Sequence, residues 1–587
     1  MRIIPALVVA SLVAPTWIAA NGGADVDVLG HRIELYRVLG PALALFGAAV
    51  VAALPPANGR RRWLHGAVLL LAALSALVLW GARVDTDWLR VHGPGRLAQA
   101  AALLAALALG LARGRIARAS VLGGLLPGLA LGALVLLGVR AADRADLDRR
   151  IAGADAHATS PDVILILVDT LRADALGAYG ADPSPSPFLD AFAEGSVVFE
   201  RAVSQAQWTA PSVSSLLSSL YPSSFLWDEE NLTHQRLIRL PAGIPWLPAV
   251  LADAGYHTAA FVKNPLLQGG TRFGEGFQIH EWVRGDTAEI HSGRQLVDAV
   301  LRWGDAMADH RAAGDGGSFF TYVHFMDPHA LYQPPPGWMP DAGDYDGPVS
   351  GGVKTLSRLA QSEAGPTPED LARVRDLYRG EVAYLDSELA RLHDGLAARG
   401  LWSDDTVVVL IADHGEQFFE HGAFFHGHVN WENLHVPFVF RAPGIRPRRI
   451  AGPVALLDLA PTLLDWLGID APEAMEGHSL VAQLRGEPLP RRFVMTERVG
   501  RGSVRATGPE VSLVEGRENW FEDASGAVIP IDAVPPEESA RLAELREAQA
   551  AWRERPLPRI EGLSDETPAL RPDADTENRL RALGYLE

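Results

Sequence analysis

Cysteine is absent from the 587 residues, and lysine occurs only twice, as Lys263 and Lys354. The absence of cysteine excludes disulfide bridges, a thiolate nucleophile and cysteine-ligated zinc. Charge is scarce and mostly negative, with 52 Lys and Arg against 71 Asp and Glu and a formal net charge of −19. A nucleic-acid-binding protein needs basic surface to displace counterions, so this balance argues against a nucleic-acid partner. With 48% hydrophobic residues, the chain is also too apolar to be a disordered protein.

The sparse charge is unevenly distributed along the chain. Residues 1–140 contain thirteen basic and five acidic residues, so the remainder is strongly acidic. A helix needs ~20 apolar residues to cross a bilayer. Stretches that approach this length are Ile3–Ala20, Leu35–Leu54, Leu64–Ala82, Leu97–Ala112 and Val121–Val139. Any one of them could be a buried soluble helix, but five in series favour a multi-pass membrane region over residues 1–140.

Arginine clusters in two loops predict the orientation of this region. Arg60–Arg62 and Arg113–Arg118 are expected in the cytoplasm, which places the chain after Arg140 outside the plasma (inner) membrane. The first stretch also fits a cleaved signal peptide. In that case too, the domains after Arg140 would lie outside the membrane. We predict a linker at 141–160, a large extracytoplasmic domain at 161–490, and a C-terminal subdomain with a tail at 491–587.

Short β-branched runs dominate the sequence after the linker. Asp162–Val168 and Thr406–Ala412 are typical of strands buried on both faces. Further apolar runs alternate with helical patterns, which indicates an α/β domain with a mostly parallel sheet flanked by helices. Four short runs between Phe493 and Phe521 predict a small antiparallel sheet in the C-terminal subdomain. Ligands of parallel sheets gather at the carboxyl ends of the strands.

Acidic residues stand at the ends of the two strongest predicted strands. Asp169 follows the first, and Asp413 with His414 follows the second. A single aspartate at such a place is more often a helix cap. Two of them, one followed by histidine, favour a metal site, because buried carboxylates need a compensating charge. Mixed oxygen and nitrogen ligands suit zinc or manganese better than calcium.

A nucleophile candidate lies between these two strands. Trp208–Ser212 precedes an apolar-periodic helical segment, and Pro211 suits a first helical turn, which places Thr209 at the helix N-terminus. The helix dipole and the free N–H groups there favour an oxyanion. Taken alone, Thr209 would more often be only a helix cap, and the nucleophile interpretation depends on its partners.

An ordered set of motifs resembles the sulfatase branch of the alkaline phosphatase superfamily. The set comprises Val168–Asp174, Trp208–Ser212, Ala254–Ala259, Phe325–His329, Ala412–Glu416, Val436–Pro437 and Arg581–Glu587. The resemblance implies an alkaline-phosphatase-like fold. It also implies one divalent metal ion (Zn, Mn or Ca), with Asp169, Thr209, Asp413 and His414 as its ligands and Thr209 as the nucleophile.

The same resemblance implies a group of cations around an anionic ester substrate. Lys263 and His329 match substrate-contacting positions, and either His426 or His428 matches a third. Other polar residues near the motifs have two interpretations. Arg172 and Asp174 would orient the first metal loop or form a surface salt bridge. Glu416, Glu420 and His421 would support the ligands or, as we favour, form a polar loop.

Four departures from the family pattern bear on the reaction. Sulfatases convert cysteine or serine to formylglycine, and Thr209 cannot form that aldehyde. The other departures are Thr170, Val213 and Asn264–Pro265, the last in place of a common Trp-His pair. The threonine branch of the superfamily includes phosphodiesterases and phosphoglycerol or phosphoethanolamine transferases. We therefore expect hydrolysis or transfer of phosphate esters, lipid-linked ones included. The alternatives are a sulfuric ester hydrolase of the arylsulfatase type and a non-catalytic receptor or scaffold.

Overall fold

The computed structural model describes residues 25–28, 31–34 and 143–558, the last range with gaps at 154–157, 159, 226–239, 269–270, 284–292, 315, 500–502, 509–510, 516–519 and 524–525. The chain divides into two units, Met1–Gly138 and Val139–Glu587. In the first, β1 (Asp25–Val28) and β2 (His31–Glu34) form an antiparallel hairpin. The five apolar stretches lie outside the described residues. Within the described ranges, every helix is too short or too polar to cross a membrane.

The second unit is built on an eight-stranded sheet with the order β12-β4-β11-β8-β3-β7-β5-β6. The strand β11 is antiparallel to both of its neighbours, and the other pairs are parallel. All six residues of the central strand β3 are buried, as its continuous apolar run predicts. The strands are β3 (Val163–Val168), β4 (Val197–Val203), β5 (His257–Val262), β6 (Ile279–Trp282), β7 (Phe319–Phe325), β8 (Val407–Ala412), β11 (His435–Arg441) and β12 (Arg448–Ala455).

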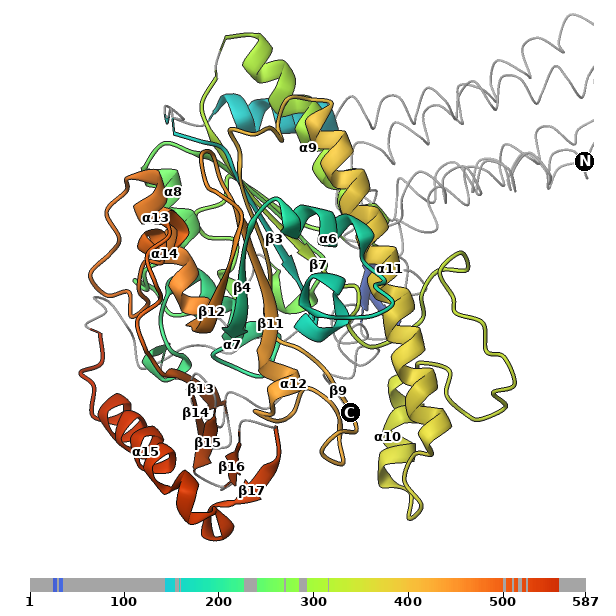
Figure 1. The fold of residues 1–587 in the computed structure, drawn as a ribbon. Helices are drawn as coiled ribbons and strands as arrows, with labels where there is room; N and C mark the ends of the chain where they lie inside the picture. The colour runs from blue at the N-terminus through green and yellow to red at the C-terminus, as the bar shows by residue number, and fades with distance from the viewer. Residues whose placement is uncertain are drawn as a thin grey trace, which may run out of the picture. The chain divides into compact units, whose positions relative to one another are not determined.

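Helices cover both faces of this sheet (Figure 1). One layer contains α6 (Pro187–Glu194), α9 (Gly293–Ala312) and α11 (Pro368–Ala397), where α11 contacts the other two. The other contains α7 (Thr209–Ser218), α8 (Leu247–Asp253), α13 (Leu459–Leu467) and α14 (Val481–Arg485). Shorter elements near this sheet are α10 (Val353–Gln361), β9 (Gln417–Phe418), β10 (Phe424–Phe425) and α12 (Trp431–Leu434). The mostly parallel α/β fold predicted from the sequence is confirmed.

A five-stranded antiparallel sheet follows, again as predicted. It contains β13 (Val494–Arg498), β14 (Ser503–Thr507), β15 (Ser512–Glu515), β16 (Trp520–Glu522) and β17 (Val528–Pro530). The helix α15 (Ser539–Arg553) packs its buried Leu542 and Leu545 against this sheet. The predicted tail lies outside the described residues from position 559 onwards.

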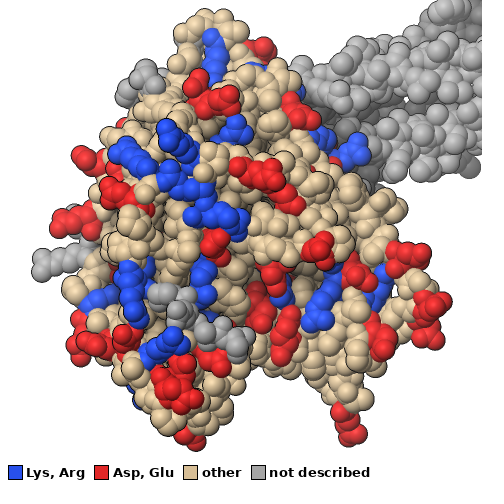
Figure 2. Space-filling model, in the orientation of Figure 1, with Lys and Arg blue, Asp and Glu red and all other residues tan. Residues whose placement is uncertain are grey.

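The predicted linker begins with a helix at 143–152. Its Ile151 is 2% exposed and belongs to the main core, while Arg144 donates to Asp309 of α9 over 2.6 Å. The start of the linker is therefore packed on the catalytic domain. Figure 2 shows acidic and basic side chains interspersed over the face of the molecule in view. Some surface charges form ion pairs, as Arg449 does with Glu200.

Candidate active site

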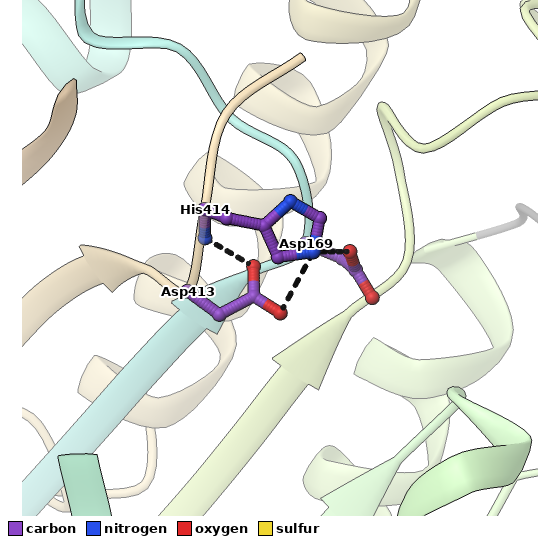
Figure 3. A group of neighbouring side chains, drawn as sticks. All are labelled: Asp169, Asp413 and His414. Carbon is purple, nitrogen blue, oxygen red and sulfur yellow. Dashed lines mark hydrogen bonds and ion pairs between the residues drawn. The ribbon is translucent and has the colours of Figure 1, made fainter. Parts of the chain in front are cut away.

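The two predicted metal-binding loops meet because β3 and β8 are parallel neighbours. Val168 is paired with Ala412 in this register, so Asp169 and Asp413 both leave the sheet at the same edge. His414 follows directly and turns its ring toward both carboxylates (Figure 3). Its Nε2 atom lies 3.6 Å from Asp169 Oδ1 and 3.6 Å from Asp413 Oδ2. One ligand atom from each of the three residues lies within 4.8 Å of the others.

Hydrogen bonds around this trio direct its free ligand atoms toward one point. His414 Nδ1 lies 2.9 Å from the Gly415 carbonyl, which can only accept, so Nδ1 carries the hydrogen and Nε2 keeps its lone pair. Asp413 Oδ1 accepts from the backbone N–H groups of Thr170 and His414. Asp169 Oδ1 and Asp413 Oδ2 are buried and have no hydrogen-bond partner among the described residues. These atoms fit a divalent cation in donor type and placement.

Burial strongly disfavours charge in this trio when no cation is present. It raises the pKa of Asp413 to about 7. It raises the pKa of Asp169 well above its ordinary range, and the neighbouring Asp413 raises it further. Burial, together with the nearby His426, lowers the pKa of His414 well below its usual value. A bound cation would reverse these preferences, because it stabilises carboxylates and a neutral imidazole.

The raised pKa of Asp413 predicts a pH-dependent loss of stability in the metal-free protein. An acid whose pKa rises from 3.8 to about 7 on folding stabilises the fold below pH 4, and this contribution disappears as the pH rises to 7. Metal-free Asp413→Asn protein should therefore gain melting temperature relative to wild type across that interval. Thermal denaturation in a chelator at pH 4 to 8 measures the difference. A constant difference over the whole range would contradict the prediction.

Thr209 is the first residue of α7, as its position before Pro211 predicts. Its Oγ1 atom lies 3.4 Å from Asp169 Oδ2 and 3.4 Å from His414 Nε2. The helix is anchored one turn later, where Ser212 Oγ donates to the Asp413 carbonyl over 2.5 Å. Thr209 is fully buried at the positive end of the helix dipole, where a negatively charged oxygen is stabilised.

The substrate-contacting candidates come from three further loops around Thr209. Lys263 follows β5, is 6% exposed, and donates from Nζ to Gln295 over 3.2 Å. His329 follows β7, and its Nδ1 atom lies 2.7 Å from the Ala330 carbonyl. The His426 ring centroid is 5.3 Å from that of His329.

His426 is the better placed of the two alternative histidines. Its ring centroid lies 4.5 Å from that of His414, which brings it beside the metal-binding trio. The His428 carbonyl accepts from Asn433 Nδ2 over 2.8 Å. Of the two alternatives that the sequence left open, His426 therefore has a ring that lies directly beside the trio.

Two residues of the site were not expected to be part of it. Asn264, interpreted only as a departure, donates from Nδ2 to Asp169 Oδ2 over 2.7 Å and to Thr209 Oγ1 over 3.4 Å. Glu416, interpreted as part of a polar loop, is fully buried and lies 3.0 Å from His426 Nδ1. In the sequence, only their positions could have indicated a role in the site. Asn264 directly follows Lys263, and Glu416 lies two residues after His414.

Arg172 joins the two metal-binding loops. It pairs with Asp174 over 2.6 Å and with Glu420 over 2.7 Å, and it donates to the Glu416 carbonyl over 3.1 Å. Its guanidinium also lies over the ring of Phe418. With its side chain 11% exposed, Arg172 is more than a surface salt bridge. His421, in contrast, pairs with Glu432 in the outer part of the loop.

The C-terminal sheet also reaches the active-site loops. Thr496 of β13 donates to the Ser204 carbonyl over 2.6 Å, and Ser204 Oγ lies 2.8 Å from Ser212 Oγ on α7. Arg505 of β14 is fully buried and donates to the Val429 carbonyl over 3.1 Å. Val429 belongs to the loop that carries His426, so the small sheet supports that loop.

Comparison with known proteins identifies the family. A sequence model of the sulfatase family matches residues 161–469, more than half of the chain, so the chain belongs to the sulfatase family. A sulfatase of Formosa agariphila is 25% identical over 417 residues, covering 62% of this chain and 81% of that protein. The choline-sulfatase of Rhizobium meliloti is 24% identical and covers 56% of this chain and 72% of its own length. The predicted resemblance is confirmed at this level, and the chain is a sulfatase-family hydrolase of ester bonds.

Other relatives and solved structures agree with the fold. The multifunctional alkaline phosphatase superfamily protein PehA of Trinickia caryophylli is 25% identical over 413 residues, covering 56% of this chain and 78% of its own. The phosphonate monoester hydrolase of Silicibacter pomeroyi superposes with a TM-score of 0.55 at 21% identity, covering 70% of this chain and 99% of that one. These similarities establish an alkaline-phosphatase-like α/β fold.

Proposed function

We propose that the protein is a metal-dependent hydrolase or transferase of phosphate esters that uses Thr209 as its nucleophile. The observation that carries the proposal is the position of Thr209 Oγ1, at the N-terminus of α7 and 3.4 Å from both Asp169 Oδ2 and His414 Nε2. A simple helix cap would not need a fully buried carboxylate pair beside it. A scaffold would have no reason to keep two unpaired carboxylate oxygens buried together.

The chemistry of threonine favours phosphate over sulfate. Formylglycine releases sulfate because its hydrate collapses to an aldehyde, and Thr209 has no second oxygen on its Cβ with which to do so. A threonine phosphate is different, because water or an acceptor alcohol can attack at phosphorus. The side chain at 209 therefore supports a phosphoryl intermediate better than a sulfuryl one.

Asp169, Asp413 and His414, together with Thr209, would hold the divalent ion. Such an ion would supply Lewis-acid stabilisation of the Thr209 alkoxide and of the charge on the phosphoryl oxygens. Lys263, His329 and His426 form the cationic or hydrogen-bonding wall that binds the ester anion. They stabilise its oxygens in the transition state and protonate the leaving group.

The two half-reactions balance without any further reagent. In the first, a bond forms between Thr209 Oγ1 and phosphorus, the bond from phosphorus to the leaving oxygen breaks, and the Thr209 proton ends on the leaving alcohol. In the second, water or an acceptor alcohol attacks phosphorus, its proton returns to Thr209, and the Oγ1–phosphorus bond breaks. Hydrolase and transferase differ only in the second acceptor.

Two observations bear on the alternatives within this proposal. PehA is named a multifunctional protein of the alkaline phosphatase superfamily, which supports a fold of this kind carrying more than one activity. Several relatives are named sulfatases, so hydrolysis of sulfuric esters is the second candidate.

We also propose a plasma-membrane anchor and an extracytoplasmic site for anionic substrates, lipid-linked ones included. The basis is the apolar series between Ile3 and Val139. A reporter fused after Glu587 that is active in the cytoplasm would contradict this orientation.

A substrate panel tests the proposal. The purified full-length protein is assayed on a bis-aryl phosphate diester, an aryl phosphate monoester and an aryl sulfate, each with zinc, manganese and calcium in turn. We expect kcat/KM for the better phosphate ester to exceed that for the sulfate by on the order of 10²-fold, about 2.7 kcal/mol of transition-state stabilisation. Turnover of the sulfate alone would overturn the choice of phosphate.

A further inference from the structure

We propose that Asn264 is a catalytic residue that donates a hydrogen bond to the attacking oxygen of Thr209. The inference rests on the proposed function, because it assigns a role within the Thr209 reaction. Asn264 follows β5 directly after Lys263 and is fully buried. Its Nδ2 atom lies 2.7 Å from Asp169 Oδ2 and 3.4 Å from Thr209 Oγ1, so it reaches both a predicted metal ligand and the nucleophile.

The orientation of the Asn264 carboxamide is determined by the following turn. Its Oδ1 atom accepts from the Leu266 backbone N–H over 2.9 Å, at the start of the 3₁₀ helix Pro265–Leu267. The amide nitrogen must therefore face Asp169 and Thr209. A carboxamide nitrogen can only donate. Toward Asn264, Thr209 Oγ1 is thus an acceptor, and the contact strengthens as that oxygen gains negative charge.

This donor acts on the atom whose charge changes in both half-reactions. Oγ1 becomes an alkoxide before it attacks phosphorus, and it leaves phosphorus as an alkoxide when the intermediate breaks down. A preorganised N–H group beside such an atom stabilises the transition state more than the ground state. Asn264 also donates a hydrogen bond to Asp169 Oδ2. The other oxygen, Asp169 Oδ1, has no hydrogen-bond partner among the described residues and is available for a cation.

Two departures from the family pattern are in direct contact here. Threonine at 209 replaces the residue that becomes formylglycine, and asparagine at 264 replaces a common tryptophan after the lysine. Hydrated formylglycine carries two hydroxyl groups on one carbon, whereas Thr209 carries a hydroxyl and a methyl group. The carboxamide of Asn264 provides a polar contact for the one oxygen that remains.

Asn264→Asp is the first variant, because it keeps the Oδ1 acceptor for the Leu266 N–H and replaces the donor with an oxygen, which also adds a negative charge beside Asp169. Asn264→Ser is a second variant without an added charge. Gln483→Leu is the matched control, since it removes a buried amide that donates to the Pro488 carbonyl beside α14. All are made in the full-length protein, with melting temperature, metal dissociation constant, kcat and KM measured for each.

We expect both Asn264 variants to lower kcat by on the order of 10²-fold at saturating metal, with KM changed by only a few fold. In rapid-quench experiments read by intact mass, the phosphoryl adduct on Thr209 should form more slowly by a similar factor. Gln483→Leu should retain wild-type kinetics. If saturating metal restores kcat and adduct formation in Asn264→Ser, the residue acts only through Asp169 and the inference is overturned. If the wild-type enzyme turns over with no adduct and Thr209→Ala is equally active, the proposed function itself fails.

Discussion

Thr209→Ala should lower kcat for the preferred phosphate ester by on the order of 10³-fold or more, a loss typical of removing a nucleophile. The variant removes the only side-chain oxygen at the N-terminus of α7 that lies within 3.4 Å of both Asp169 and His414 in the described part of the chain. The fold should be retained, because Ser212 Oγ still donates to the Asp413 carbonyl and holds the helix in place. Steady-state kinetics and melting temperature measure the two effects.

Thr209→Ser is the matched control for this variant. It keeps the hydroxyl group and removes only the methyl group, so turnover within about tenfold of wild type is expected from an intact nucleophile. The phosphoryl adduct should appear in the wild type and in Thr209→Ser and be absent from Thr209→Ala. Equal activity of the alanine variant would mean that water attacks the ester directly and that Thr209 is only a helix cap.

Removal of divalent metal should abolish turnover and destabilise the protein together. Asp169 Oδ1 and Asp413 Oδ2 are buried acceptors without partners in the described residues, so a cation relieves the repulsion between two desolvated carboxylates. Free metal at about one hundred times its Kd should raise the free energy of unfolding by about 2.7 kcal/mol. Dialysis against a chelator, followed by zinc, manganese or calcium, separates the metals by activity and by melting temperature.

Asp413→Asn and His414→Ala are the controls for the metal experiment. Asp413→Asn loses the charge of one ligand and His414→Ala loses a ligand altogether, so the gain in melting temperature on adding metal should shrink or disappear. A purified wild-type protein without bound metal, and with no thermal shift on its addition, would instead favour the receptor or scaffold alternative. Affinity should also fall as the pH decreases through 7, because protons compete for Asp413.

The sequence was sufficient for the framework of the site, because that framework follows from strand geometry. Continuous apolar runs predicted β3 and β8, and the residue after each run was acidic. Parallel strands end at the same edge, so the sheet class predicted that Asp169 and Asp413 lie at one edge, and the pairing of β3 with β8 brings them together. Pro211 located the start of α7, and therefore Thr209, to the residue.

The remaining features depend on loop conformations that have no periodic signal. Asn264 contributes through a side chain oriented by the Leu266 N–H, an interaction that exists only once the turn after β5 has formed. The sequence around Glu416 predicted a polar loop. In the structure β9 pairs with β10, and Glu416 is buried beside His426. The choice between His426 and His428 required that same loop, since the two residues differ by two positions in an irregular segment.

The bond from Arg505 to the Val429 carbonyl gives the C-terminal sheet a place in the catalytic apparatus. The match to the family model ends at residue 469, before the first strand of this sheet. A fragment cut at that residue would keep every predicted ligand and Thr209 while losing the support beneath the His426 loop. The border of the matched segment is therefore not the border of the proposed active site. Sequence change in a seemingly peripheral sheet can then adjust the position of the proposed substrate-contacting histidine without altering any other residue of the site.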